Sequence, residues 1–292
     1  AFNYRALIKE IYNMEQRSYK GSDDYVVTRE LMNAVNVAMA LERPLLIKGE
    51  PGTGKTMLAQ SISDALGLKL ICWSIKSTTK AQDGLYTYDT VRRLYDGQFK
   101  EGDVKNIKSY IKPGKLGEAF MSEERTVLLI DEIDKADLEF PNDLLWELDQ
   151  MEYYIYETKE TVKAKIRPIV IITSNAEKEL PDAFLRRCIF HYIEFPDKEK
   201  MKEIINVHYG NMDEELVEKA IEAFYKIRDM GELSKLPSTS ELLDWIKALK
   251  VSGVNVERIG EEIPYVGVLL KKDQDILAME EIRTKGFTLR GF

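Results

Sequence analysis

Cysteine is scarce in this 292-residue sequence, in which the only two, Cys72 and Cys188, lie far apart and outside any Cys-x-x-Cys pair. Such usage argues against a structural zinc site and is typical of proteins from a reducing compartment. We interpret both cysteines as small residues buried in a protein core.

Long apolar runs are also missing. No stretch reaches the ~18 consecutive apolar residues that indicate a membrane-spanning helix. The opening residues, AFNYRALIKEIYNMEQRSYKGSDD, are mixed and charged, unlike a signal peptide. We therefore expect a cytoplasmic protein with no membrane partner, and the chain shows neither an internal repeat nor a long linker.

Positive charge is in deficit. The chain has 42 Lys and Arg residues against 50 Asp and Glu, which gives a formal net charge of −8. Non-specific binding along nucleic acid needs a basic surface, so this composition argues against nucleic acid as the partner. One loose basic cluster, which we interpret as a solvated face, is formed by Lys105, Lys108, Lys112 and Lys115.

A phosphate-binding loop is the strongest motif that is present. Residues 45–62 read LLIKGEPGTGKTMLAQSI, and Gly49, Gly54, Lys55 and Thr56 fit the pattern G-x-x-x-x-G-K-[ST]. An apolar run precedes the loop and helical spacing follows it, which is the strand–loop–helix context that the motif requires. We predict that a nucleotide contacts Gly49, Glu50, Pro51, Gly52, Thr53, Gly54, Lys55, Thr56 and Met57.

The residue types in this loop have chemical reasons. Gly52 and Gly54 let the backbone curl so that its N–H groups point at phosphate oxygens. The N-terminus of the following helix adds a positive dipole end. Lys55 can reach the β and γ phosphates, and the Thr56 hydroxyl can ligate Mg²⁺. The loop therefore predicts a nucleotide that is bound together with Mg²⁺.

A second apolar strand ends in two acids. In RTVLLIDEIDKAD, residues 125–137, Val127 to Ile130 form a continuous apolar run, which is typical of a central parallel strand. Asp131 and Glu132 follow at its carboxyl end, where ligands bind in open α/β sheets. We expect Asp131 to contact Mg²⁺ and Glu132 to orient and deprotonate the attacking water, a pair that indicates hydrolysis.

A third apolar strand, PIVIITSN at residues 168–175, ends in Asn175, whose amide could lie near the γ-phosphate and the water. A simple strand-end turn is the alternative for this asparagine. Beyond it, Arg186 and Arg187 precede another expected strand. Such a pair is either ordinary solvated surface or the source of an arginine finger that reaches a neighbouring subunit's nucleotide.

The motifs, in chain order, are GEPGTGKT, LLIDEID, IITSN and LPDAFLRRC followed by FPD. The order of these motifs resembles that of the AAA+ ATPases, and specifically that of the MoxR family. PSTSELLDWIKAL and IPYVGVLLKKDQDI, nearer the C-terminus, are similar to the same family. The resemblance covers residues 22–275 or thereabouts and implies an α/β fold, a P-loop αβα core with a parallel sheet followed by a small helical lid. It also implies ATP and Mg²⁺ as ligands, and a homohexameric ring in which ATP lies between subunits.

The family motifs also imply roles for single residues. Asn175 matches the first sensor, and Arg187 fits the arginine finger better than Arg186 does. Relatives remodel, assemble or activate protein complexes as chaperones, commonly through a von Willebrand factor A domain adaptor, so a protein client is the leading expectation. Two alternatives stay open: a nucleic-acid-linked motor such as a McrB-type restriction ATPase, and a nucleotide switch that rarely cleaves ATP. The acidic composition argues against the first, and Glu132 argues against the second.

The resemblance fails at one position. Relatives with PSTRELL have a second-sensor arginine where this chain has Ser240. The usual arginine on the γ-phosphate is therefore absent or supplied from elsewhere. A helix is still well specified here, because Ser238 and Glu241 have capping-box spacing ahead of an apolar face.

We divide the chain into an N-terminal helical extension at 1–24, a nucleotide-binding domain at 25–195, a helical lid at 196–275 and a tail at 276–292. Within the domain we expect two insertions, the first interrupting a helix at about 77–124 and the second forming a hairpin at about 152–167. In the resembling family such insertions face a central pore, and surface ornament without function is the alternative. Thr28 and Asp197 are predicted helix N-caps.

Overall fold

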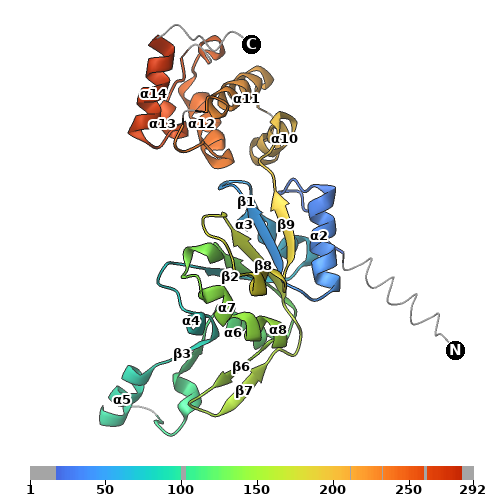
Figure 1. The fold of residues 1–292 in the computed structure, drawn as a ribbon, viewed down its shortest axis with the longest axis vertical. Helices are drawn as coiled ribbons and strands as arrows, with labels where there is room; N and C mark the ends of the chain where they lie inside the picture. Colours follow the sequence, from blue (N-terminus) through green and yellow to red (C-terminus); the bar gives the residue numbers. More distant parts are fainter. Residues whose placement is uncertain (1–17, 100–102, 211, 232, 260–261, 285–292) are drawn as a thin grey trace, which may run out of the picture. The chain divides into compact units, whose positions relative to one another are not determined.

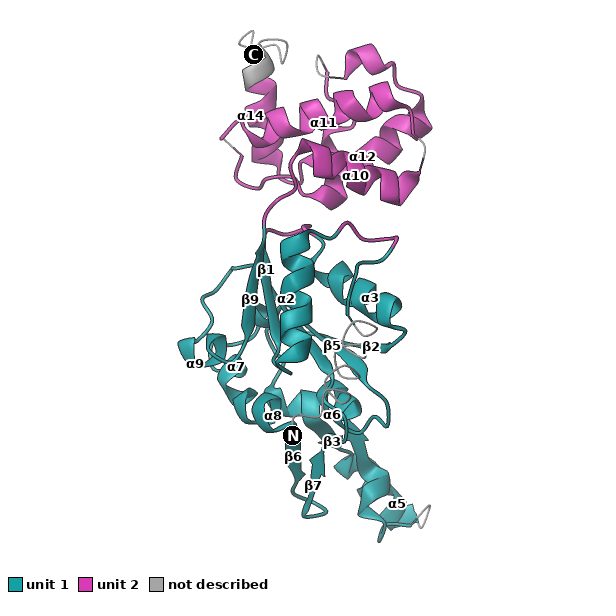
Figure 2. Ribbon diagram, turned by 90° about the vertical axis from the view of Figure 1, so that its right-hand side faces the viewer, with its two compact units in different colours: residues 1–22, 27–49, 54–193 teal, residues 23–26, 50–53, 194–292 magenta. Residues whose placement is uncertain are grey.

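The computed structural model places the chain in two compact units, which Figure 2 colours separately. The residues that it describes are 18–99, 103–210, 212–231, 233–259 and 262–284. Unit 1 is formed by residues 18–22, 27–49 and 54–193. Unit 2 is formed by residues 23–26, 50–53 and the described residues from 194 onward. Most of the predicted extension, 1–17, and the end of the predicted tail, 285–292, lie outside the described residues.

A five-stranded parallel sheet forms the centre of unit 1, and its strands have the order β2-β5-β8-β1-β9 (Figure 1). Strands β5, β8 and β1 are buried along almost their whole length, as expected of parallel strands that are covered on both faces. The predicted α/β class, a parallel sheet followed by helices, is therefore confirmed. The strands are β1 (Leu45–Gly49), β2 (Lys69–Ser74), β5 (Thr126–Asp131), β8 (Ile169–Ser174) and β9 (Ile189–Ile193).

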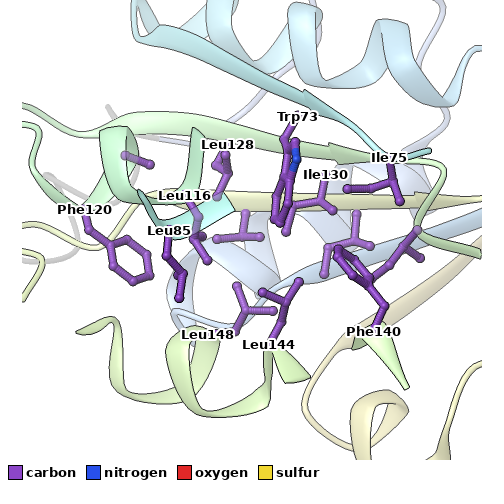
Figure 3. Packing of buried hydrophobic residues seen from close by; sticks show 14 of the residues in the cluster. Trp73, Ile75, Leu85, Leu116, Phe120, Leu128, Ile130, Phe140, Leu144 and Leu148 are labelled. Carbon is purple, nitrogen blue, oxygen red and sulfur yellow. The ribbon is translucent and has the colours of Figure 1, made fainter. Parts of the chain in front are cut away.

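Helices cover both faces of this sheet, because alternate side chains of each strand point to opposite faces. On one face Leu46, Trp73, Leu128 and Ile130 pack with short helices into the core cluster of Figure 3. Those helices are α4 (Ala81–Leu85), α6 (Lys115–Phe120), α7 (Phe140–Asp143), α8 (Leu145–Gln150) and α9 (Asp182–Leu185). The opposite face is covered by α2 (Arg29–Ala40), which contacts β1 and β9, and by α3 (Lys55–Leu66), which contacts β1, β2, β5 and β8.

Residues 18–22 group with unit 1, which corrects the prediction of a separate helical extension up to residue 24. Tyr19 is fully buried, and its hydroxyl lies 2.6 Å from Ser61 Oγ on α3. The backbone of Tyr19 also exchanges two hydrogen bonds with the Asn36 amide on α2, at 2.8 and 2.9 Å. A single aromatic residue in a charged segment has no periodic pattern, so the sequence does not mark it as core.

Both expected insertions form small antiparallel sheets. The first runs from β3 (Tyr86–Tyr88) through α5 (Thr90–Phe99) and η1 (Ile107–Tyr110) to β4 (Ile111–Pro113). The second is the hairpin of β6 (Glu152–Ile155) and β7 (Glu160–Lys163), as its composition predicts. They lie side by side (Figure 1), and the Lys108–Glu160 ion pair at 2.7 Å joins them. Because α4 and α6 pack into the core, the first inserted part is 86–113, which is shorter than predicted.

The basic cluster of lysines has local partners. Three of its four lysines have exposed ammonium groups that pair with carboxylates nearby, which agrees with the interpretation of a solvated face. The pairs are Lys108–Glu160 at 2.7 Å, Lys112–Asp89 at 2.9 Å and Lys115–Glu118 at 3.2 Å.

Unit 2 is a group of helices around its own apolar core. Its elements are α10 (Lys198–Tyr209), α11 (Glu214–Arg228), α12 (Thr239–Ser252), η3 (Val256–Arg258), α13 (Val266–Leu269) and α14 (Asp273–Thr284). Asp197 caps α10 as predicted, and Ser238 with Glu241 forms the predicted capping box of α12. The predicted lid boundary at residue 275 is wrong, because α14 continues past it and packs Ile276 and Met279 into the core.

The cysteines differ in their surroundings. Cys188 is buried in the core, and burial raises its pKa to about 12. Cys72 is exposed on the edge strand β2, which corrects the interpretation of both as core residues. Since an edge strand is covered less completely than a central one, its alternate residues reach solvent. In the described part of the chain, no helix combines the length and apolar character that crossing a membrane requires.

Candidate functional site

The phosphate-binding loop begins at the end of β1 and leads into α3. Gly52 and Gly54 have φ angles of 78° and 82°, a left-handed conformation that other residues rarely adopt. Lys55 is the first residue of α3, with 6% of its surface exposed, and its ammonium donates to the Gly49 carbonyl at 2.8 Å. A curled glycine backbone, a helix N-terminus and an ammonium group therefore meet here, which is an arrangement that binds phosphates.

Residues 50–53 of the loop group with unit 2, and the side chains of Glu50 and Thr53 have partners there. The Glu50 carboxylate pairs with Arg228 at 2.7 Å, and the Thr53 hydroxyl donates to the Glu50 carbonyl at 2.9 Å. That Glu50, Pro51 and Thr53 contact a nucleotide stays a prediction. Met57, in the first turn of α3, is 44% exposed.

Asp131 lies at the carboxyl end of β5, next to α3 and β8. Its Oδ1 accepts from the Thr56 hydroxyl at 3.0 Å and from the Thr173 hydroxyl at 2.7 Å. Neighbouring parallel strands end at the same edge of a sheet, and β5 is paired with β8 so that Ile130 lies opposite Ile172. The two predicted magnesium ligands, Thr56 and Asp131, are therefore in direct contact.

These two side chains suit Mg²⁺. A hydroxyl and a carboxylate are hard oxygen ligands, and Mg²⁺ is commonly bound through one or two such groups together with substrate phosphates. In the described residues, no group of three or more His, Cys, Asp or Glu side chains forms a metal site by itself. The donor set thus fits an ion that arrives with a nucleotide and takes its remaining ligands from phosphate and water.

Glu132 is fixed by its backbone and by both carboxylate oxygens. Its φ is 58°, and its N–H donates to Thr173 Oγ1 at 2.8 Å. Oε1 accepts from Asn175 Nδ2 at 2.9 Å, and Oε2 accepts from the ammonium of Lys135. The hydrogen bond to Glu132 raises the pKa of Lys135 above its usual value. The predicted base and the predicted first sensor therefore touch, with Lys135 as a third member.

Asp134 holds the segment that carries Asn175. It is 3% exposed, and its carboxylate accepts from the backbone N–H groups of Asn175 at 3.4 Å and Glu177 at 3.0 Å. No motif in the sequence singles out this residue. The available signal in the sequence was an acid directly after Ile133, in the turn η2 (Ile133–Lys135) that follows the apolar strand β5, because a carboxylate buried there must have partners.

The two arginines lie apart from this cluster. Arg187 Nε donates to Asp149 Oδ2 at 2.5 Å and Nη1 to the Ala183 carbonyl at 2.8 Å. The carbonyls of Arg186 and Arg187 both accept from Arg43, which fixes the backbone of the pair. The structure thus brings Thr56, Asp131, Glu132 and Asn175 together, whereas an action of either arginine on a neighbouring subunit stays a prediction.

Comparisons with known proteins agree with this geometry. Residues 44–188 match the family model described as AAA domain (dynein-related subfamily). The chain is 29% identical over 191 residues to Lon protease 1 of Bacillus subtilis (strain 168), covering 61% of this chain and 22% of that protein. It is 27% identical over 205 residues to Midasin of Giardia intestinalis, covering 65% and 4%. It is 23% identical over 289 residues to Pachytene checkpoint protein 2 homolog of Danio rerio, covering 92% and 61%.

The chain spans less than two thirds of the length of each of these relatives. The matched residues 44–188 include Lys55, Asp131, Glu132 and Asn175, so the family match and the side-chain cluster concern the same part of the chain. The match supports the AAA+ resemblance and leaves the MoxR assignment a prediction.

Proposed function

We propose that this chain, which carries an AAA domain over residues 44–188, hydrolyses ATP with Mg²⁺ and thereby remodels a protein client as a MoxR-type chaperone. The observation that carries the hydrolysis step is the contact of Glu132 with Asn175, beside the paired Asp131 and Thr56. A protein that only holds phosphate needs the loop but needs no carboxylate placed to take a proton from water.

Each residue of the cluster has one task in this reaction. The loop backbone and Lys55 bind the phosphates, and Thr56 with Asp131 would hold Mg²⁺, which offsets phosphate charge when it is bound. The Asn175 amide orients the Glu132 carboxylate. Glu132 takes a proton from water as the water oxygen bonds to the γ-phosphorus and the bond from that phosphorus to the β–γ bridging oxygen breaks. ADP and phosphate are the products.

A Glu132→Gln substitution tests this assignment. The glutamine keeps an oxygen that can accept from Asn175, but it cannot accept a proton from water. We expect ATP binding to persist and turnover to fall at least about a hundredfold, the scale of a lost general base. Phosphate release and calorimetric ATP affinity measure the two effects.

The matched control for this test is Glu139→Gln, an exposed acid in the same unit that makes no contact with the cluster in the described residues. Turnover of the Glu139→Gln control should equal that of the parent. A substitution of the proposed magnesium ligand, Asp131→Asn, should differ from Glu132→Gln by weakening the Mg²⁺-dependent binding of ATP. Turnover at the parent rate in Glu132→Gln would place the base elsewhere and remove the support for hydrolysis at this site.

The client part of the proposal is supported by the insertions. Helix α5 has no buried residue, and its apolar side chains include Val91 at 79%, Leu94 at 69% and Phe99 at 56% exposure. The β6–β7 hairpin adds Tyr156 at 73% exposure. Contiguous exposed apolar side chains mark protein-binding surfaces. In our proposal the insertions contact the client within a homohexameric ring, directly or through a von Willebrand factor A domain adaptor.

A double substitution, Val91→Asp with Leu94→Asp, tests this surface. Both positions are exposed, so folding and basal ATP turnover should stay unchanged. The double substitution is placed in a Glu132→Gln background, which retains ATP. This variant should capture about tenfold less client protein than Glu132→Gln alone, because loss of an apolar anchor lowers binding affinity at least about tenfold. Pulldown with quantitative mass spectrometry measures the ratio.

Val251→Asp, an equally exposed valine on α12, is the matched control and should leave capture unchanged. If the α5 double variant captured as much client protein as Glu132→Gln alone, α5 would have no role in client binding. Captured material that nuclease releases would favour the nucleic-acid alternative.

A further inference from the structure

The ion pair between Lys135 and Glu132 has no task in the reaction described above. Lys135 lies three residues after Glu132, and its ammonium contacts Glu132 Oε2. The side chain of Lys135 is 43% exposed and that of Glu132 is 32% exposed, so both lie at the surface of the site. Lys135 thus contacts the carboxylate that is proposed to take the proton from water, although no step of the proposed reaction uses this lysine.

The position of Lys135 is fixed by the backbone around it. Lys135 N–H donates to the Glu132 carbonyl at 3.0 Å, which closes the turn η2. Lys178 Nζ donates to the Ala136 carbonyl at 2.8 Å, and the buried Asp134 ties the same turn to the segment after β8. The chain therefore presents the lysine to Glu132 from a rigid turn, and the pairing does not depend on a flexible loop.

Both oxygens of the Glu132 carboxylate are engaged in this arrangement. Asn175 binds Oε1 through a neutral amide, and Lys135 binds Oε2 through a charged ammonium. A carboxylate accepts a proton from water only through an oxygen that the water can reach. The amide contact can orient the group while the other oxygen works, whereas the ammonium contact occupies that second oxygen.

We propose that Lys135 is a positioning residue that restrains Glu132, so that the base acts only after the Lys135–Glu132 contact opens. This inference rests on the proposed function, because it assumes that Glu132 activates water. We expect the restraint on Glu132 to be weak, because both partners of the ion pair are exposed. An ion pair as exposed as this one contributes little, so its removal changes the rate by a small factor.

The test is a Lys135→Met substitution in the full chain, which keeps the length of the stem and removes the charge. We expect kcat for ATP hydrolysis to rise about three- to fivefold, the factor that corresponds to an exposed ion pair, with KM unchanged. Lys135→Arg keeps a cation in reach of Oε2 and should keep the parent kcat. Lys165→Met breaks an exposed ion pair with Glu123, which involves neither Glu132 nor Lys135, and should have no effect on kcat.

Each result has one meaning. A kcat for Lys135→Met that equals or falls below the parent, in a variant with the parent's melting temperature, overturns the restraint. A rise that Lys135→Arg shows equally also overturns it, because the charge would then have no role. Glu132→Gln is measured alongside. If Glu132→Gln retains the parent rate, the proposed function has failed, and if it is inactive while Lys135→Met is not faster, only the restraint has failed.

Discussion

Replacement of Lys55 by alanine is expected to abolish nucleotide binding that calorimetry can detect. Lys55 is buried at the start of α3, and its ammonium is held by the carbonyl of Gly49, at the beginning of the loop. A buried ammonium is a strong partner for phosphate oxygens, because charge-assisted hydrogen bonds gain strength where water is excluded. The glycine backbone, the helix dipole and the two proposed Mg²⁺ ligands remain in the variant, but the loop has lost the ammonium that binds the β and γ phosphates.

Because Lys55 is buried, alanine could also loosen the loop itself. Lys55→Met is therefore a necessary second variant, since it fills the space of the stem without the charge. Lys69→Ala, which removes an exposed lysine paired with Glu118 at 2.8 Å, is the matched control and should bind ATP as the parent does. Normal affinity in both Lys55 variants would remove the phosphate-loop assignment.

The parts of the fold that the sequence predicts well are those with a local pattern. The apolar runs at Leu45–Ile47, Val127–Ile130 and Ile169–Ile172 became the three central strands, because a strand buried on both faces has no polar alternation to obscure it. The helix N-caps Thr28 and Asp197 could be predicted because an N-cap side chain accepts a hydrogen bond from a backbone N–H only three residues further along the chain.

The parts that the sequence did not predict depend on register between strands and on packing at a distance. Thr173 binds Asp131 only because β8 and β5 are neighbours in one register, and no spacing in the sequence reveals that pairing. Tyr19 reaches Ser61 across many residues. Lys135 was within reach of prediction, since it follows Glu132 by three residues, but the hydrogen bond depends on the left-handed φ of Glu132.

Arg187→Ala is expected to retain ATP binding and to lose turnover by about a thousandfold, the lower end for an arginine finger. The reason is that in the proposed ring one subunit alone is an incomplete enzyme. Within the single chain Arg187 is bound to Asp149 and to the Ala183 carbonyl, so the guanidinium is held at the surface of α8 and α9 and not at the chain's own Glu132 cluster. Arg186→Ala is the matched control and should lose less. Phosphate release and ATP affinity are measured for both variants.

Mixing of subunits separates action in trans from action in cis. Arg187→Ala subunits retain Glu132, and Glu132→Gln subunits retain Arg187. A mixed ring places some intact Glu132 sites beside an intact Arg187, so the mixture should recover activity that neither variant has alone. The specific activity of the parent should also rise with protein concentration, because the complete site forms only on assembly. The half-exposed Asp149 pair suits this role, since it orients the guanidinium without burying it. If specific activity stayed constant on dilution to monomer and mixing recovered nothing, Arg187 would be a residue of its own subunit, held by Asp149 for stability, and the shared site would have no support.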